Sequence, residues 1–251
     1  MYYKFKDGIK LTGTLVNAAA IVAGGAIGLL FKKSIKESFA DSINKSLGLA
    51  ILIIGLNGVI SNMFTVDDGK IASGGELLLV IFLVIGTLIG ELLRLEDRFK
   101  NFSDGIEKKF GKGGFSAGFI SSTLLFCIGA MAIIGALNDG LKNDSSILFV
   151  KSALDFTTAI ILGATVGFGV MFSSIPILLY QGGITLLAGA LGGLLQGELL
   201  EQVCFVGYAI IVAIGLNFIF DKKFKTLNMV PAIFLPIAYH YILMLINYIK
   251  G

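Results

Sequence analysis

The sequence is poor in the residue types on which most enzyme and metal sites depend. Its 251 residues include one histidine, two cysteines, three prolines and no tryptophan, and only 15% of them are charged. Cys127 and Cys204 stand alone, without a Cys-x-x-Cys pair, which argues against a disulfide framework and against a thiolate metal site. His240 has no neighbouring ligands, and the chain contains no Ser/His/Asp arrangement and no phosphate-binding loop. We therefore expect a protein that is not an enzyme and that carries no cofactor and no metal.

Long charge-free runs dominate the chain. Hydrophobic residues make up 55% of it, the mean hydropathy is +0.88, and glycine is abundant at 33 residues. A membrane-spanning helix needs about 20 mainly apolar residues, and glycine is commoner in such helices than in soluble ones. The runs approach or exceed that length, at residues 11–31, 46–66, 113–138, 156–197, 203–220 and 226–247. The sequence therefore predicts an integral protein of the lipid bilayer. Its net charge of +3 is spread unequally over the loops, which indicates topology and not nucleic-acid binding.

These runs predict an all-α, polytopic transmembrane helix bundle. We expect about eight spans, at residues 11–31, 44–64, 75–95, 115–137, 147–172, 177–196, 201–220 and 229–248. Seven spans is the alternative, because the second helix and the break between the fifth and sixth helices carry the weakest signals. Residues 1–10 are interpreted as an N-terminal extension, and residues 11–251 as a single transmembrane domain.

Polar segments mark the expected connections between the spans. Asp67-Asp68-Gly69 predicts a turn between the second and third helices, and Ser173-Ser-Ile-Pro176 predicts the break between the fifth and sixth. The loop that begins at Asp139 and ends in Asp144-Ser-Ser supplies good residues for capping the fifth helix.

The longest polar segment, residues 94–113, combines six basic residues with phenylalanines at helical spacing that begin at Phe99 and Phe102. This pattern predicts an amphipathic helix along the membrane surface. Glu91 precedes Arg94 by three residues, and we expect the two to form a local ion pair, with a proton relay as the less favoured alternative.

The basic residues of the loops indicate how the bundle is oriented. When the loops are assigned alternately to the two sides, one side has six lysines, and the other has thirteen basic residues, which are Lys32, Lys33, Lys36, Lys45, Arg94, Arg98, Lys100, Lys108, Lys109, Lys112, Lys222, Lys223 and Lys225. An excess of Lys and Arg marks the cytoplasmic side. We therefore expect both termini on the outside of the membrane.

Two parts of the chain resemble each other. Asn17-AAAIVAGGAIGLL aligns without a gap on Gln181-GGITLLAGALGGL, and Ile54-Gly-Leu-Asn57 recurs as Ile214-Gly-Leu-Asn217. The offset is five helices, an odd number, so matching helices would cross the membrane in opposite directions. Such inverted repeats are common in secondary transporters, although chance alignment of Gly/Ala/Leu-rich helices explains the match equally well. The repeats would be residues 11–95 and 177–249, with the central helices of residues 115–172 between them.

The stretch of residues 147–172 organises the candidate site, because it carries charge in its first half. Lys151 and Asp155 are four residues apart, so on a helix they share one face and can neutralise each other. Charge inside a span is costly, and it is normally paired, turned away from lipid and functional. Two interpretations of equal weight stay open: a structural ion pair that anchors this helix in the bundle, and a substrate or proton site.

Polar residues in or beside the other apolar runs complete the candidate site. For each by itself, an interhelical hydrogen bond worth about 0.6–2 kcal/mol is the favoured interpretation. As a set they predict the lining of a polar cavity. The candidate substrate- or ion-binding residues are Asn17, Asn138, Asp139, Lys151, Asp155, Thr158, Gln181 and Thr185.

Four Gly-x-x-x-Gly motifs predict close helix contacts, because only small residues allow two backbones to approach. They are Gly24/Gly28, Gly86/Gly90, Gly163/Gly167 and Gly189/Gly193.

Motifs along nearly the whole chain resemble one family. The opening Gly13-Thr-Leu-Val-Asn17, the segment Lys151-Ser-Ala-Leu-Asp155, Tyr180-Gln-Gly and Asn228-Met-Val-Pro231-Ala are similar to motifs of the bacterial membrane proteins grouped as domain of unknown function 554. The likeness covers the chain after Lys10. It implies a bacterial inner-membrane protein with transport as a candidate activity, and it implies no substrate.

The leading hypothesis is a secondary transporter of a small polar solute or ion. A channel would use the same polar lining without alternating access, and a membrane scaffold or sensor would use every polar group structurally. Saturable, gradient-coupled uptake separates the transporter from the channel, and the absence of any flux or ligand-induced stabilisation favours the scaffold. The sequence is also compatible with a homo-oligomer.

Overall fold

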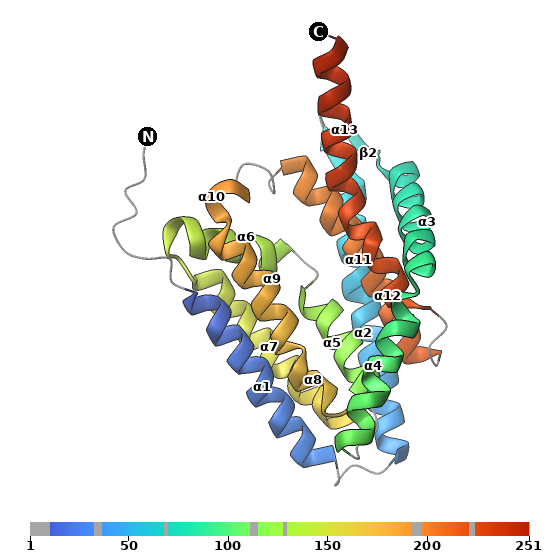
Figure 1. Cartoon of the computed structure of the whole chain (residues 1–251), viewed down its shortest axis with the longest axis vertical. Helices are drawn as coiled ribbons and strands as arrows, with labels where there is room; N and C mark the ends of the chain where they lie inside the picture. Colours follow the sequence, from blue (N-terminus) through green and yellow to red (C-terminus); the bar gives the residue numbers. More distant parts are fainter. Residues whose placement is uncertain are drawn as a thin grey trace.

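The computed structural model describes residues 11–32, 37–67, 70–110, 115–127, 130–191, 197–220 and 224–250. Nearly all of them are helical, and the helices form one bundle (Figure 1). Seven helices are long and apolar enough to cross a membrane, and one bent pair adds an eighth crossing if it is counted as one span. The expected all-α polytopic bundle is confirmed. The expected N-terminal extension, residues 1–10, lies outside the described part of the chain.

The first three spans follow their apolar runs. They are α1 (Thr12–Lys32), α2 (Glu37–Met63) and α3 (Glu76–Leu93). α2 begins before the charge-free run of residues 46–66, and polar residues such as Glu37 and Asp41 lie in its first turns. The first two helices therefore leave only a short connection between them.

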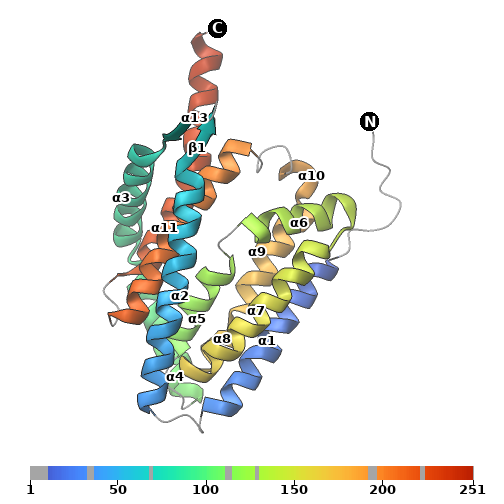
Figure 2. The ribbon, with the colours of Figure 1, turned by 180° about the vertical axis from the view of Figure 1, so that it is seen from behind.

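A short hairpin, which the sequence did not predict, joins α2 to α3. β1 (Phe64–Asp67) pairs antiparallel with β2 (Lys70–Ser73), with Phe64 opposite Ser73 and Asp67 opposite Lys70. The expected turn at Asp67-Asp68-Gly69 falls between these strands, but Asp68 and Gly69 lie outside the described residues. The hairpin lies at one end of the bundle, the upper end in Figures 1 and 2.

The expected amphipathic helix is α4 (Leu95–Phe110), at the opposite end of the bundle from the hairpin (Figures 1 and 2). Its apolar face packs on the helix that follows it, since the ring of Phe99 stacks on that of Phe119 with centroids 5.0 Å apart. The predicted ion pair between Glu91 and Arg94 is wrong. Arg94 has a φ of 50° and ends α3, so the two residues do not share a helical face, and Glu91 instead accepts hydrogen bonds of 3.0 and 3.1 Å from Lys225.

The fourth expected span is two helices, not one. α5 (Phe115–Cys127) and α6 (Ala130–Lys142) are bent by 61° relative to each other, so the single helix predicted over residues 115–137 is corrected. In the sequence Gly129 stands at this junction, and glycine is a poor helix former.

The fifth expected span, residues 147–172, is interrupted before its end. α7 (Ser146–Thr165) stops at a turn in which Gly167 has a φ of 121°, a conformation that side chains other than glycine rarely adopt. α8 (Gly169–Phe172) already belongs to the next span, which continues through α9 (Ser174–Leu186). The predicted break at Ser173–Pro176 is therefore wrong, because Pro176 lies in the first turn of α9, where its missing N–H costs no hydrogen bond.

The remaining elements are α10 (Ala188–Leu191), α11 (Gly197–Ile219), α12 (Thr226–Met229), the 3-10 helix η1 (Val230–Phe234) and α13 (Leu235–Lys250). The last three together form the final span. Residues 192–196, with which the sixth helix was expected to end, lie outside the described part.

α1 and α7 form one closely packed pair and run parallel, since Gly13 packs on Leu148 and Gly28 packs on Ile160 further along both helices. A Cβ atom on Gly28 would stand 2.1 Å from the Ile160 carbonyl oxygen, far inside van der Waals contact. The backbones of the two helices therefore touch.

α2 and α11 form a second closely packed pair and run antiparallel, with Gly48 against Gly215 and Gly58 against Tyr208. α3 packs antiparallel on the last span in the same way, through Gly86 on Ala232. The views in Figures 1 and 2 place α1 with α7, α8 and α9 on one side of the molecule, and α2, α3 and α11–α13 on the other.

Candidate functional site

The centre of the candidate site is the ion pair between Lys151 and Asp155 on α7. The Lys151 ammonium donates a hydrogen bond to the Asp155 carboxylate, and the two residues are only 6% and 8% exposed. The ammonium also lies 6.0 Å from the ring centroid of Phe126. The predicted pairing on one helix face is confirmed, and the pair faces the interior of the bundle and not lipid.

Two amide side chains from neighbouring helices lie beside this pair. The side-chain nitrogen of Asn17 on α1 donates a 3.2 Å hydrogen bond to the side-chain oxygen of Gln181 on α9, and both residues are fully buried. The Asn17 side chain also lies near the Asp155 carboxylate. Four predicted residues from three helices, Asn17, Lys151, Asp155 and Gln181, therefore form one buried polar centre.

Further polar side chains extend from this centre toward the hairpin end of the bundle. Thr14 lies one turn before Asn17 on α1, and Thr185 lies one turn after Gln181 on α9, and both are fully buried. Asp139, near the end of α6, is 1% exposed and accepts a 2.5 Å hydrogen bond from Ser145. We call the buried polar centre together with these three residues the polar track.

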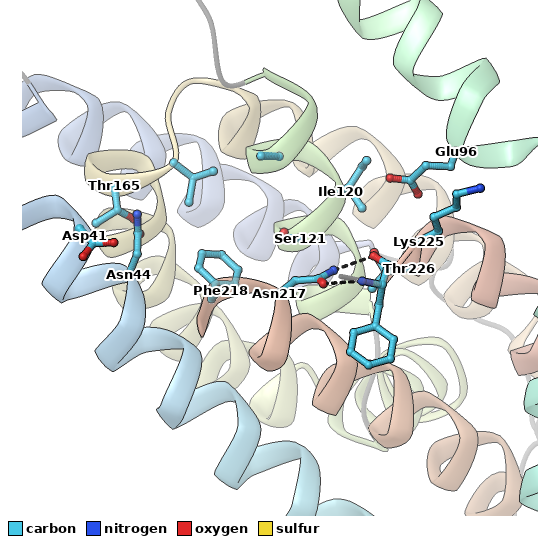
Figure 3. Close-up of a pocket in the computed structure, with 13 residues that line it drawn as sticks. Asp41, Asn44, Glu96, Ile120, Ser121, Thr165, Asn217, Phe218, Lys225 and Thr226 are labelled. Carbon is cyan, nitrogen blue, oxygen red and sulfur yellow. Dashed lines mark hydrogen bonds between the residues drawn. The ribbon is translucent and has the colours of Figure 1, made fainter. Parts of the chain in front are cut away.

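A pocket of about 460 Å³ lies at the other end of α7 (Figure 3). Its wall is formed by α2, α4, α5, α7, α11 and α12, with Asp41, Thr165 and Asn217 among the lining residues. Asn217 shapes this wall, because its side chain donates a 2.8 Å hydrogen bond to the Phe224 carbonyl oxygen and accepts one of 2.8 Å from the Phe224 N–H (Figure 3). We call this cavity the α4-side pocket.

An apolar layer lies between the α4-side pocket and the polar track. Val166 and Phe218 line the pocket and pack against a cluster of buried apolar side chains that includes Leu162 and Phe126. Phe126 in turn lies against Lys151. The pocket has a mixed polar and apolar lining, the track is polar, and the cluster that connects Val166 and Phe218 with Phe126 is apolar.

The sequence of this chain matches one family model over residues 12–241, that of "Protein of unknown function (DUF554)". The chain belongs to the DUF554 family. This confirms the family resemblance drawn from its motifs.

Two relatives are similar to this chain over almost their whole length. An "Uncharacterized membrane protein YdfK" of Bacillus subtilis is 33% identical over 224 residues, which cover 89% of this chain and 93% of the relative. An "Uncharacterized protein YqgA" of Escherichia coli is 32% identical over 230 residues, with 89% of this chain and 93% of the relative covered. No solved structure matches the chain significantly. The relatives support a membrane protein and name no substrate.

Two predicted residues of this DUF554 protein are not among the buried side chains of the polar track. Thr158 donates a 2.9 Å hydrogen bond to the carbonyl oxygen of Leu154 in its own helix, and its hydroxyl is exposed at the bundle surface. Asn138 is half-buried, and its carbonyl oxygen accepts a 3.3 Å hydrogen bond from the backbone N–H of Asp144. Both were selected as polar residues within an apolar run or at its end.

Thr14 is the member of the track that the sequence reasoning missed. It precedes Asn17 by three residues, a spacing that places two side chains on the same helix face. That spacing would have identified it, since Gln181 and Thr185 show the equivalent spacing of four on α9.

Proposed function

We propose that this protein is a secondary transporter of a small polar solute or ion in the bacterial cytoplasmic membrane. The buried polar centre carries the proposal: a charged pair and an amide pair from α1, α7 and α9 meet inside a bundle of apolar helices. Burying charge in a membrane is expensive, and such groups mark substrate and ion pathways. Asp155 is the tenth of the twenty residues of α7, a position near mid-depth.

The position of the apolar layer supports a carrier over a channel. A channel conducts through one continuous pathway, whereas a carrier keeps its site closed toward at least one side. Here the α4-side pocket stops at Val166 and Phe218, and buried apolar side chains fill the space up to Lys151. Alternating access would require α7 and its neighbours to open this layer.

The packing of the aligned helices supports an inverted repeat as the architecture of such a carrier. The alignment pairs α2 with α11, and the bounds of the expected repeats, residues 11–95 and 177–249, set α3 against the last span. These same elements pack antiparallel on each other, at Gly48 with Gly215 and at Gly86 with Ala232. A two-fold axis in the membrane plane relates inverted repeats, so equivalent helices that lie near this axis pack antiparallel on each other.

A membrane scaffold remains the alternative, because Lys151 and Asp155 also satisfy each other. The test is a thermal-shift screen of the purified protein against amino acids, sugars, organic acids and inorganic salts, followed by uptake of each stabilising compound into proteoliposomes with an imposed ion gradient. Saturable uptake that collapses with the gradient supports the transporter. Stabilisation without uptake, or no response to any compound, contradicts it.

We further infer that the α4 end of the bundle faces the cytoplasm and that both termini face outward. The basic residues that flank α4 support this orientation. The structure places α4 and the hairpin at opposite ends (Figures 1 and 2), so one residue at each end suffices for a test.

In a variant without Cys127 and Cys204, single cysteines at Asp67 and at Asn101 are to be probed in intact cells with an impermeant maleimide. We expect labelling of the Asp67→Cys protein only, because position 67 belongs to the hairpin and position 101 to α4. After permeabilisation both should react, which controls for accessibility. Labelling of Asn101→Cys but not of Asp67→Cys in intact cells would reverse the orientation.

A further inference from the structure

Four buried oxygen atoms of the polar track have no hydrogen-bond partner among the described residues: Thr14 Oγ1, Asn17 Oδ1, Asp139 Oδ2 and Thr185 Oγ1. Each residue is at most 1% exposed. Buried polar groups in proteins are nearly always satisfied, because leaving one unpaired in an apolar interior costs its whole desolvation energy. The side-chain nitrogen of Gln181 in the same track is also without a partner in the described part of the chain, but four of these five atoms are oxygens, which indicates a ligand that interacts with oxygen.

The helix packing brings these four residues toward one region. α1 and α9 run antiparallel, with Asn17 bonded to Gln181, so Thr14 on α1 and Thr185 on α9 both lie one turn closer to the hairpin end. Thr14 also lies close to Gly182, since a Cβ atom built there would be 3.9 Å from the Thr14 methyl group. α6 joins at the same level, because a Cβ atom on Gly140, beside Asp139, would lie 2.2 Å from the Thr185 carbonyl oxygen.

The charge balance of this region selects the ligand class. Lys151 and Asp155 neutralise each other, which leaves the Asp139 carboxylate as the uncompensated charge among the residues of the track. α6 and α9 both end here, at Lys142 and Leu186, and the carboxyl ends of helices favour cations. One carboxylate with neutral oxygens balances one positive charge. No group of three or more His, Cys, Asp and Glu side chains occurs in the described part of the chain, so the donor set does not resemble a transition-metal site.

We propose that Thr14, Asn17, Asp139 and Thr185 bind a monovalent cation, Na⁺. Hydroxyl, amide and carboxylate oxygens are the ligands that hard cations prefer. The proposed binding of the ion does not depend on the proposed transporter function. Its consequence, that Na⁺ is the coupling ion, rests on the proposed transporter function: Asn17 is part of the proposed ion site and lies near the Asp155 carboxylate, so occupancy of the ion site should affect the charged pair one turn deeper.

The first measurement is the thermal stability of the full-length protein in detergent as Na⁺ replaces N-methyl-D-glucamine at constant ionic strength. A thiol-reactive fluorophore can report unfolding, because Cys204 is buried and Cys127 half-buried in the native state. A saturable rise of about 5 °C or more is expected at Na⁺ concentrations far above the dissociation constant. K⁺ is the comparison ion and should give a smaller rise. No difference between Na⁺ and N-methyl-D-glucamine would overturn the proposal and leave water as the partner of these oxygens.

Variants separate binding from folding. Thr185→Val removes one ligand oxygen and keeps the side-chain volume, so the Na⁺-dependent rise should be lost or shifted at least about tenfold in concentration. Its stability without Na⁺ should be unchanged or higher, because an unpaired buried hydroxyl has gone. Asp139→Asn should also lose the response. Thr158→Val is the matched control: its hydroxyl is bonded to Leu154 in its own helix, so the response to Na⁺ should stay as in the parent protein. A normal response in Thr185→Val and Asp139→Asn would overturn the assignment of the site.

The response of the unfolding temperature to Na⁺ is measured in detergent, so it does not depend on transport. A Na⁺ response in detergent with no uptake of any compound into proteoliposomes would keep the ion site and refute the transporter. Uptake that is driven by a proton gradient and indifferent to Na⁺ would keep the transporter and refute Na⁺ as its coupling ion.

Discussion

Removal of one member of the Lys151–Asp155 pair is expected to cost far more stability than removal of both. Asp155→Leu leaves the Lys151 ammonium uncompensated in the bundle interior, and Lys151→Met does the same to the carboxylate. Breaking a buried pair in this way costs about 3–5 kcal/mol, whereas replacing both charges by apolar side chains of similar size is often nearly neutral. The double variant Lys151→Met/Asp155→Leu should therefore recover much of the lost stability. Unfolding temperature and yield of monodisperse protein, measured in one detergent, provide the comparison.

The chain offers a matched control for this experiment. Asp41 and Lys45 on α2 have the same spacing of four and form a 2.7 Å ion pair, but their side chains are 59% and 54% exposed. Exposed pairs contribute about 0–1 kcal/mol, so Asp41→Leu should hardly change the unfolding temperature.

Activity must be measured on the same three variants, because stability alone does not separate the two roles of the pair. If Lys151 and Asp155 serve only the structure, the double variant should keep ligand binding and uptake. If Asp155 binds a proton or cation during transport, stability returns in the double variant and activity does not. Wild-type stability and activity in both single variants would show that the pair reaches water, and the site proposed here would then be misplaced.

Much of the polar centre was predictable from the sequence because polar residues are rare in long apolar runs. Lys151 and Asp155 stand out in residues 147–172, and their spacing of four already implies a shared helix face. Asn17 and Gln181 were selected in the same way, and the structure joins them by one hydrogen bond. Residue type and spacing were sufficient here, since a membrane interior leaves few alternatives for such groups.

The course of the backbone was harder to predict, because hydropathy does not record it. Val166-Gly167-Phe168 is as apolar as the span before it, so nothing in the composition revealed that Gly167 takes a positive φ and ends α7. Pro176 looked like a breaker but lies where a helix tolerates proline. Long-range partners were equally hidden: Glu91 was assigned to Arg94, three positions further along a helix that has already ended, and its real partner is Lys225.

Substitutions at the α1–α7 contact should affect both fold and site. In Gly28→Ala the new methyl group would lie 2.1 Å from the Ile160 carbonyl oxygen and 2.8 Å from the Ala164 nitrogen. Both are backbone atoms, so no side-chain rotation relieves the clash and the two helices must separate. Overpacking of this kind destabilises the folded protein by about 1–3 kcal/mol. We expect a loss of stability at the upper end of this range or beyond it. Gly163→Ala should behave similarly, because its methyl group would lie 2.6 Å from the Gly25 carbonyl oxygen.

The same two helices carry Asn17 and Asp155, so separation should also weaken ligand-induced stabilisation in these variants. Gly183→Ala in α9 is the matched control, since no heavy atom lies within 4 Å of its added Cβ. It should raise stability by about 0.5–1 kcal/mol, because alanine favours a helix over glycine by that amount.

Gly167→Leu should also be destabilising, but for another reason than the shared helix face that the sequence suggested: a φ of 121° strains any side chain. Wild-type unfolding temperatures for Gly28→Ala and Gly163→Ala together would show that the α1–α7 contact is looser than described.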